Sequence, residues 1–319
     1  MRSLVVALLC AAASAAVLHA QTTYDTLENI SLFGWLDQYS LDNSHYNFVG
    51  DEACVPTSST NAMTYLQNID PGLFGTSLTG TTYSDWISTD ATLISSPYMD
   101  TKPSSGTYFY RIPYALTKYV TADRGFGLQM SGMFYPGSWN PPDYPQPSFV
   151  TNAVPTGDFL YQSLASQSAV LLSIYYTNGA GGHELLGSGL QWTDLNNDGI
   201  IDFNENATLS FVDPLDPSAT YPGNEPGGAA KFTTGHIWYD STAGDLRLSY
   251  DQYQGALPYS SSDYQVVTAD IINALSVSPV PESTAWAYVP AVLLLLEVLR
   301  RRSPRLAMTK ARAGFIRKD

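Results

Sequence analysis

The second half of the chain consists of short apolar runs separated by turn residues, and this pattern constrains the fold more than any other feature. The first run, residues 169–176, reads AVLLSIYY, a composition that favours a strand. Further runs of this kind follow at residues 184–192, 208–212, 231–239 and 246–250. Because no helical pattern separates these runs, the sequence predicts an antiparallel sheet in this half.

The first half has a different pattern. Helical stretches are expected at residues 56–68 and 107–119, among segments rich in turn residues. A proline-rich stretch at 136–147 reads as an ordered loop or crossover, and a short helix is expected at 158–167. Helices early and an antiparallel sheet late predict an α+β domain with an N-terminal helical lobe and a C-terminal β lobe.

The N-terminus has the pattern of a secretory signal peptide at residues 1–20. Arg2 supplies a positive charge, an apolar run extends from Leu4 to Val17, and Ala20 is a small residue at the expected cleavage site. We therefore expect export, with a folded domain at residues 21–278.

A second apolar block, residues 285–299, lies near the C-terminus. The pair Pro281-Glu282 precedes it and the cluster Arg300-Arg301-Arg302 follows it. This pattern resembles the PEP-CTERM sorting signal, with a sorting or transmembrane segment at 279–302 and a basic cytoplasmic tail at 303–319. The resemblance implies processing by an exosortase-type enzyme and transient anchoring in the membrane. The implied destination is the cell surface or extracellular matrix of a Gram-negative-type bacterium. The alternative is an uncleaved membrane anchor.

The expected domain is strongly acidic. Residues 21–280 hold six Lys and Arg against 26 Asp and Glu, a net charge of −20. Such a surface repels phosphate backbones and anionic lipid, so we expect no nucleic-acid partner. Membrane contact is expected only through the C-terminal segment.

Removal of the signal peptide leaves one cysteine, Cys54, so no intrachain disulfide can form. A free thiol in an oxidising compartment is a liability unless it is buried or used. Pro56 suits the first turn of a helix, which places Cys54 at the helix N-terminus. The helix dipole and free backbone N–H groups there favour a thiolate and can stabilise an oxyanion. Cys54 is therefore a candidate nucleophile, and a buried structural cysteine is the alternative.

A cysteine nucleophile needs a base, and His183 is the first candidate. It follows Gly181-Gly182, which lets the backbone approach a neighbour closely at the opening of a predicted strand. His236 is the second candidate, although its neighbours favour a strand histidine packed against aromatic rings. His45 is expected in a loop.

An orienting carboxylate is expected on a neighbouring strand. Asp213 ends the run at 208–212, and Pro214 stops the strand directly after it. Asp216 is the reserve candidate, and a simple turn aspartate is the alternative.

The order of Cys54, then Gly-Gly-His183, then Asp213-Pro resembles papain-like cysteine peptidases, especially bacterial C39-like domains. Those domains have a Cys-Gly-Pro-Thr helix start, a Gly-His strand and a later Asp-Pro. The resemblance implies a papain-like fold, with Cys54 as nucleophile and His183 as general acid and base. Asp213 is the implied group that fixes the imidazole tautomer.

The chain departs from that pattern at two places. Val55 replaces the usual Gly, and Phe48 stands near the position of the usual oxyanion Gln. Asn47 is our candidate for the oxyanion side chain, with Gln38 or Asn43 as alternatives.

Residues 194–205 fit the twelve-position calcium loop, with Gly199 at position 6 and Ile201 as the apolar residue at position 8. The flanking runs are predicted strands, so we expect Ca²⁺ to bind a connection inside the sheet. An acidic surface turn is the alternative. Since the loop joins the strand of His183 to the strand of Asp213, we expect calcium to support both stability and activity. The expected ligands are the side chains of Asp194, Asn196, Asp198, Asp202 and Glu205 and the backbone carbonyl of Ile200.

The sequence therefore predicts a calcium-stabilised, secreted cysteine peptidase that acts on protein or peptide substrates. The alternative is a non-catalytic surface or matrix binding protein that keeps a degenerate papain-like fold. A third possibility is acyl transfer, since an amine can resolve the same thioester.

Overall fold

The computed structural model describes residues 21–41, 52–139, 141, 143–177, 181–215, 232–250 and 266–278. The chain divides into two compact units between Ser278 and Pro279, and every described residue belongs to the first unit. The expected signal peptide and sorting segment lie outside the described residues, as do Asn43, His45, Asn47 and Asp216. Within the described ranges, no helix is long and apolar enough to cross a membrane.

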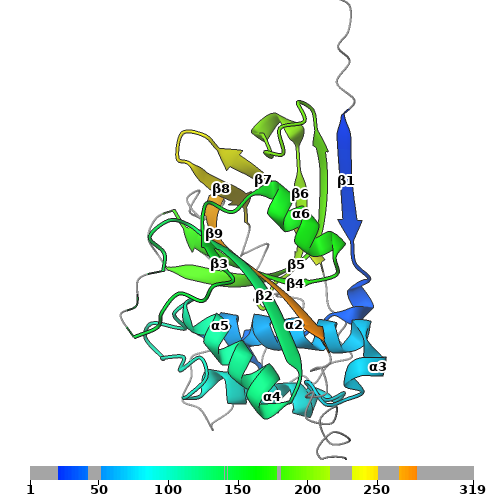
Figure 1. Cartoon of the computed structure of the whole chain (residues 1–319), viewed down its shortest axis with the longest axis vertical. Helices are drawn as coiled ribbons and strands as arrows, with labels where there is room; N and C mark the ends of the chain where they lie inside the picture. The colour runs from blue at the N-terminus through cyan, green and yellow to red at the C-terminus, as the bar shows by residue number, and fades with distance from the viewer. Residues whose placement is uncertain are drawn as a thin grey trace, which may run out of the picture. The chain divides into compact units, whose positions relative to one another are not determined.

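Short helices precede most of the strands in the chain (Figure 1). The helical elements are η1 (Ile30–Leu32), η2 (Gln38–Leu41), α2 (Cys54–Ile69), α3 (Pro71–Phe74), α4 (Tyr83–Ile94), α5 (Arg111–Leu116) with its π-helical extension η4 (Thr117–Asp123), α6 (Gly157–Ala165) and η5 (Phe203–Glu205). The strands are β1 (Thr22–Leu27), β2 (Gly127–Phe134), β3 (Val150–Asn152), β4 (Ala169–Tyr176), β5 (Gly182–Asp194), β6 (Thr208–Val212), β7 (Phe232–Asp240), β8 (Asp245–Ser249) and β9 (Val266–Ser278).

Six antiparallel strands form a closed ring in the order β4-β5-β6-β7-β8-β9, because β4 pairs with both β5 and β9. The remaining strands extend this ring. β1 pairs with the second half of β5, β2 pairs with β9, and β3 runs parallel to β2. A single sheet thus joins the first described strand of the chain to the last.

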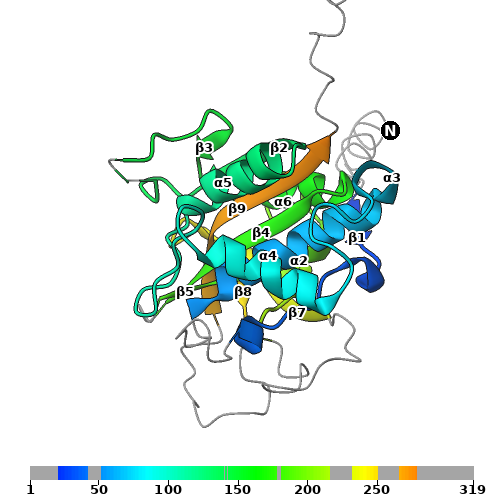
Figure 2. The same ribbon diagram turned by 90° about the horizontal axis from the view of Figure 1, so that it is seen from below.

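The helix α2 packs directly on the sheet, against β4 and β5, and α4 lies beside it (Figure 2). Most of α2 is buried, and its sequence is correspondingly rich in small residues and hydroxyls. The hydroxyls of Thr60 and Thr64 donate to backbone carbonyls one turn earlier, at 3.0 Å each. Hydroxyls satisfied in this way lower the cost of burying these polar side chains.

The strand β4 is buried on both faces, in agreement with its mostly apolar sequence. On one face Ala169 and Leu171 join the core formed with α2. On the other face Val170, Leu172 and Ile174 join a second core that includes α6 and the strands β6 to β9. Since α2 shares its core with the strands, helices and sheet are packed as one unit in the described part of the chain.

The α+β class is confirmed, and the predicted strands at 169–176, 184–192, 208–212, 231–239 and 246–250 agree with β4 to β8. Sequence analysis missed β1, β2, β3 and β9, together with the helices α3 and α4. The strand β9 carries Asp270 and Asn273, and the residue Asn273 is fully buried. Polar residues therefore interrupt the apolar pattern of β9, and an interrupted pattern of this kind favours a loop prediction.

Candidate active site

Cys54 is the first residue of α2 and is 8% exposed. The preceding Ala53 makes no side-chain hydrogen bond to this end of the helix. Pro56 has no N–H, and Thr57 N–H already donates to the Ala53 carbonyl at 3.1 Å. The first-turn N–H groups of Cys54 and Val55 are thus the backbone donors that this helix start offers to a ligand.

His183 is the second residue of β5 and is also buried. A Cβ at the preceding Gly182 would lie 2.7 Å from the carbonyl oxygen of Ile174 on β4. Glycine is therefore required there for the close approach of the two strands, as the sequence indicated. This approach fixes the backbone that carries the imidazole.

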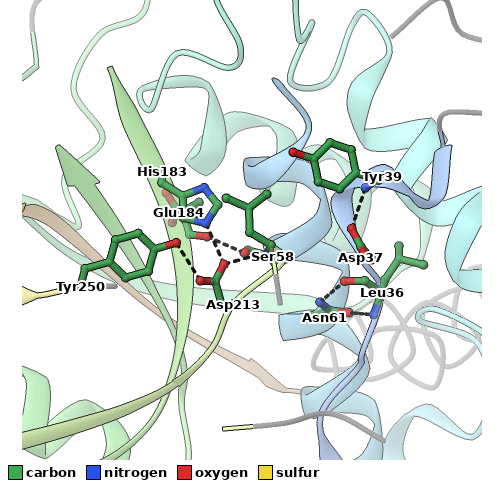
Figure 3. Close-up of polar contacts among 10 residues, drawn as sticks. Leu36, Asp37, Tyr39, Ser58, Asn61, His183, Glu184, Asp213 and Tyr250 are labelled. Atoms are coloured by element: carbon green, nitrogen blue, oxygen red, sulfur yellow. Dashed lines mark hydrogen bonds and ion pairs between the residues drawn. The ribbon is translucent and has the colours of Figure 1, made fainter. Parts of the chain in front are cut away.

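Asp213 directly follows β6 and meets His183 in the interior (Figure 3). The Asp213 Oδ1 atom lies 2.9 Å from His183 Nε2 and accepts a second hydrogen bond, of 2.8 Å, from the Leu215 N–H. A carboxylate only accepts, so His183 Nε2 carries the proton of this bond. The other ring nitrogen, Nδ1, is left to face a partner.

Cys54 is the candidate for that partner, since it lies close enough to the imidazole to influence its pKa. Burial lowers the pKa of His183, but the charge and hydrogen bond of Asp213 and the contact with Cys54 outweigh it and raise the pKa. The site thus favours an imidazolium next to the sulfur. The structure brings all three residues of the expected Cys-His-Asp set together from α2, β5 and the end of β6.

Sequence analysis missed Tyr250, which directly follows β8. Its hydroxyl donates to Asp213 Oδ2 at 2.7 Å, and its ring centroid lies 5.9 Å from that of His183. The residue is fully buried. The alternation of Leu246, Leu248 and Tyr250 in the predicted strand could have indicated an inward tyrosine, whose hydroxyl needs a buried partner.

Two buried carboxyl groups flank the site. Glu184 accepts a 2.6 Å hydrogen bond from Ser173 Oγ, and burial raises its pKa to about 8. Asp90 on α4 accepts a 3.0 Å hydrogen bond from Thr57 Oγ1, and burial raises its pKa to about 8 as well. Burial therefore favours the protonated form of both groups. Ser58 Oγ ties α2 to β5 through the Glu184 carbonyl at 2.9 Å.

The alternative residues fall in different places. His236 lies on β7, with its ring stacked on Trp238 and edge-on to Phe203, each at 5.0 Å. This confirms the expectation of a strand histidine packed against aromatic rings. Gln38 is buried, and its N–H donates to the Pro214 carbonyl at 3.0 Å, so it lies next to the Asp213 segment.

The loop at 194–205 connects β5 to β6, as expected. Several of its side chains form hydrogen bonds with backbone groups of the same loop. Asp194 accepts from the N–H groups of Asn197 and Gly199, the latter at 2.9 Å. Glu205 accepts from Leu195 N–H at 2.8 Å and from Asp202 N–H at 2.9 Å. Among the described residues, no three His, Cys, Asp or Glu side chains are gathered closely enough to hold a metal ion.

The acidic groups of this loop nevertheless influence one another. Burial raises the pKa of Asp202, and the nearby charges of Glu205, Asp198 and Asp194 raise it further. The loop is also attached to the sheet, because Trp192 Nε1 donates to Glu205 Oε2 at 2.7 Å. Crowded carboxyl groups of this kind are the oxygen donors that Ca²⁺ prefers.

No protein-family model and no curated protein matches this chain. Function is therefore inferred from the geometry of the site. A thiol at a helix N-terminus, an adjacent imidazole and a carboxylate behind that imidazole are the groups that nucleophilic acyl chemistry requires.

Proposed function

We propose that the chain is a secreted cysteine peptidase with a papain-like fold. The observation that carries the proposal is the buried series Cys54, His183 and Asp213, in which His183 is hydrogen-bonded to Asp213 and interacts with Cys54. The fold is consistent with it, since the nucleophile begins a helix that packs on an antiparallel sheet carrying the other two residues.

In the proposed mechanism, the Cys54 thiolate attacks the carbonyl carbon of a peptide bond. The His183 imidazolium gives its Nδ1 proton to the leaving amine, and an acyl-enzyme remains. Neutral His183 then takes a proton from water, whose oxygen attacks the thioester and releases the acid and the thiol. Asp213 keeps the proton on Nε2 throughout, which leaves Nδ1 free for each transfer.

The tetrahedral intermediate needs donors for its oxyanion. We assign the backbone N–H groups at the start of α2 to this role, since no side chain caps that helix end. Asn47 remains our candidate for an additional side-chain donor, with Gln38 and Asn43 as alternatives.

Thiol reactivity tests the proposal against the non-catalytic alternative. An unperturbed thiol has a pKa of about 8.5 and is almost wholly protonated at pH 6. We expect Cys54 to react with iodoacetamide at pH 6, and to react faster with a peptide-based thiol electrophile than with this simple alkylator. Reaction only above pH 8, or only after unfolding, would contradict the proposal. Cys54→Ala should abolish hydrolysis and keep the fold.

We also propose that the loop at 194–205 binds Ca²⁺. The donor set fits a hard cation, since it consists of carboxylate, amide and carbonyl oxygens at the spacing of a twelve-position loop. Bound calcium would neutralise the negative charge that raises the pKa of Asp202. Its ligands would be those named above, from Asp194 to Glu205.

Delivery to the surface is a separate proposal, based on the resemblance of residues 279–302 to a sorting signal. Processing there should remove the tail, so mass spectrometry of surface-located protein should find no peptides from residues 311–319. The sheet ends at Ser278, so truncation directly after this residue should release a folded, soluble domain.

A further inference from the structure

Tyr250 contacts the active site from the end of β8, a strand that supplies none of the three proposed catalytic residues. Its hydroxyl donates to Asp213 Oδ2 at 2.7 Å, whereas His183 and the Leu215 N–H both bond Oδ1. Among the described residues, the tyrosine is thus the donor to the second carboxylate oxygen. The hydrogen bond from Tyr250 therefore limits rotation of the Asp213 carboxylate.

We propose that Tyr250 is a positioning residue that holds Asp213 in the rotamer and the ionised form that His183 requires. This inference rests on the proposed function, because a positioning residue has a role only where the imidazole transfers protons.

The packing around Tyr250 leaves its hydroxyl little freedom. Its ring lies 6.1 Å from that of Phe211, which stands two residues before Asp213 on β6, and 6.5 Å from that of Tyr176 on β4. The tyrosine and the aspartate are therefore carried by elements that pack together in one core. A hydroxyl fixed in this way presents a donor to Oδ2 at no further cost in side-chain entropy.

Loss of that hydroxyl has a predictable direction. Oδ2 would be a buried anionic oxygen without its donor, which disfavours the charged form of Asp213. A protonated Asp213 no longer fixes the proton on Nε2 of His183, so the proposed base loses its orientation.

Other titratable groups face this network and have to be considered in a pH experiment. Cys54 and His183 face it from α2 and β5, and Tyr176 faces it from β4. Glu184 lies next to His183 and interacts with its charge. A substitution at Tyr250 leaves all of these residues in place, so the native protein and the variant share them.

The test is Tyr250→Phe, which keeps the ring and removes one oxygen. The rate of Cys54 alkylation by iodoacetamide is measured from pH 4 to pH 9, alongside kcat and KM for a peptide substrate. We expect the acid limb of the alkylation profile to move up by about one pH unit and kcat to fall about tenfold, with KM nearly unchanged, as expected for one charge-assisted hydrogen bond.

Tyr65→Phe is the matched control, since Tyr65 is an equally buried tyrosine whose pKa is raised by burial and by the carboxylate of Glu28. Its profile should coincide with that of the native protein. A double variant keeps the test decisive if Tyr250→Phe affects folding. In an Asp213→Asn background, Tyr250→Phe should change kcat by less than twofold.

The outcomes separate the two proposals. A native protein that is unreactive at pH 6 removes the proposed function and this inference with it. A reactive native protein whose profile and kcat are unchanged by Tyr250→Phe removes the inference alone. Equal losses from Tyr250→Phe in the native and Asp213→Asn backgrounds also overturn it, because the tyrosine would then act independently of the carboxylate.

Discussion

The two ends of the β5–β6 hairpin carry acidic residues in very different surroundings. At one end, Asp213 accepts hydrogen bonds from His183, Leu215 and Tyr250, which belong to three separate segments. At the other end, Asp194 accepts from backbone groups within its own loop. One end is assembled by the tertiary fold, and the other is formed locally.

The two ends of the hairpin are therefore sensitive to different kinds of substitution. The assembled end depends on how α2, β5, β6 and β8 pack together, so changes far from Asp213 in sequence can reach it. The local end depends on the order of residues within one loop. Four substitutions or treatments test this contrast, and they are given in order of decreasing expected effect.

The largest effect is expected from His183→Ala at the assembled end. Loss of the proposed general acid and base should lower kcat/KM for a peptide substrate by about 100- to 10,000-fold. Steady-state kinetics measures this loss. His236→Ala is the control, because the ring of that residue is packed against Trp238 and Phe203. Comparable losses in both variants would contradict the assignment of His183.

The next effect concerns the buried Asp90 behind the start of α2. Its pKa of about 8 exceeds the ordinary value of about 3.9, so between these values the folded protein binds one more proton than the unfolded chain. Stability should therefore fall as pH rises in this window, by about 1.4 kcal/mol per pH unit from this group, and the slope should vanish above the higher value.

Asp90→Asn should remove that contribution, and urea unfolding at pH 5, 6 and 7 in EDTA measures it. The exposed Asp85 serves as control, since hydrogen bonds from Thr82 and Thr81 lower its pKa. Asp85→Asn should leave the falling slope in place. An unchanged slope in Asp90→Asn would show that this carboxyl group is ionised in the folded protein.

A smaller loss of stability is expected from Gly34→Ala. An added Cβ would lie 2.6 Å from Asn61 Oδ1 and 2.8 Å from Asn61 Cα. The Asn61 amide binds both the N–H and the carbonyl of Leu36, at 2.9 and 3.0 Å, and so ties the N-terminal segment to α2. Overpacking here should cost about 1–3 kcal/mol in urea unfolding. Gly72→Ala, with its nearest contact at 3.6 Å, should be close to neutral.

The smallest effect is expected at the local end. Extracellular calcium sites bind at about 0.1–1 mM, so millimolar calcium should stabilise the fold by roughly 0.4–1.4 kcal/mol. Chelation should lower the melting temperature and reduce turnover less than His183→Ala does, and Glu205→Gln should mimic chelation. Unchanged stability together with no calcium uptake in titration calorimetry would identify the loop as an acidic turn.

The same contrast explains what the sequence could predict. The loop is encoded by consecutive residues, and Cys54, His183 and Asp213 each stand at the start or end of a predicted element. Tyr250 was missed because its role depends on β8 pairing with β9 and on the depth of the core, neither of which is a local property. The burial of the Glu184 carboxyl group was not predicted either, since a position in a strand does not by itself show how deep the side chain lies.

The strand β9 determines when the domain can finish folding. It closes the ring by pairing with β4 and β8, and it also pairs with β2, although it is the last described strand before the boundary at Ser278. Contacts between segments so distant in sequence slow folding. A chain that emerges N-terminus first holds an open ring with exposed apolar edges until residues 266–278 emerge. Premature termination before Ser278 should therefore yield an aggregation-prone fragment and not a smaller functional domain.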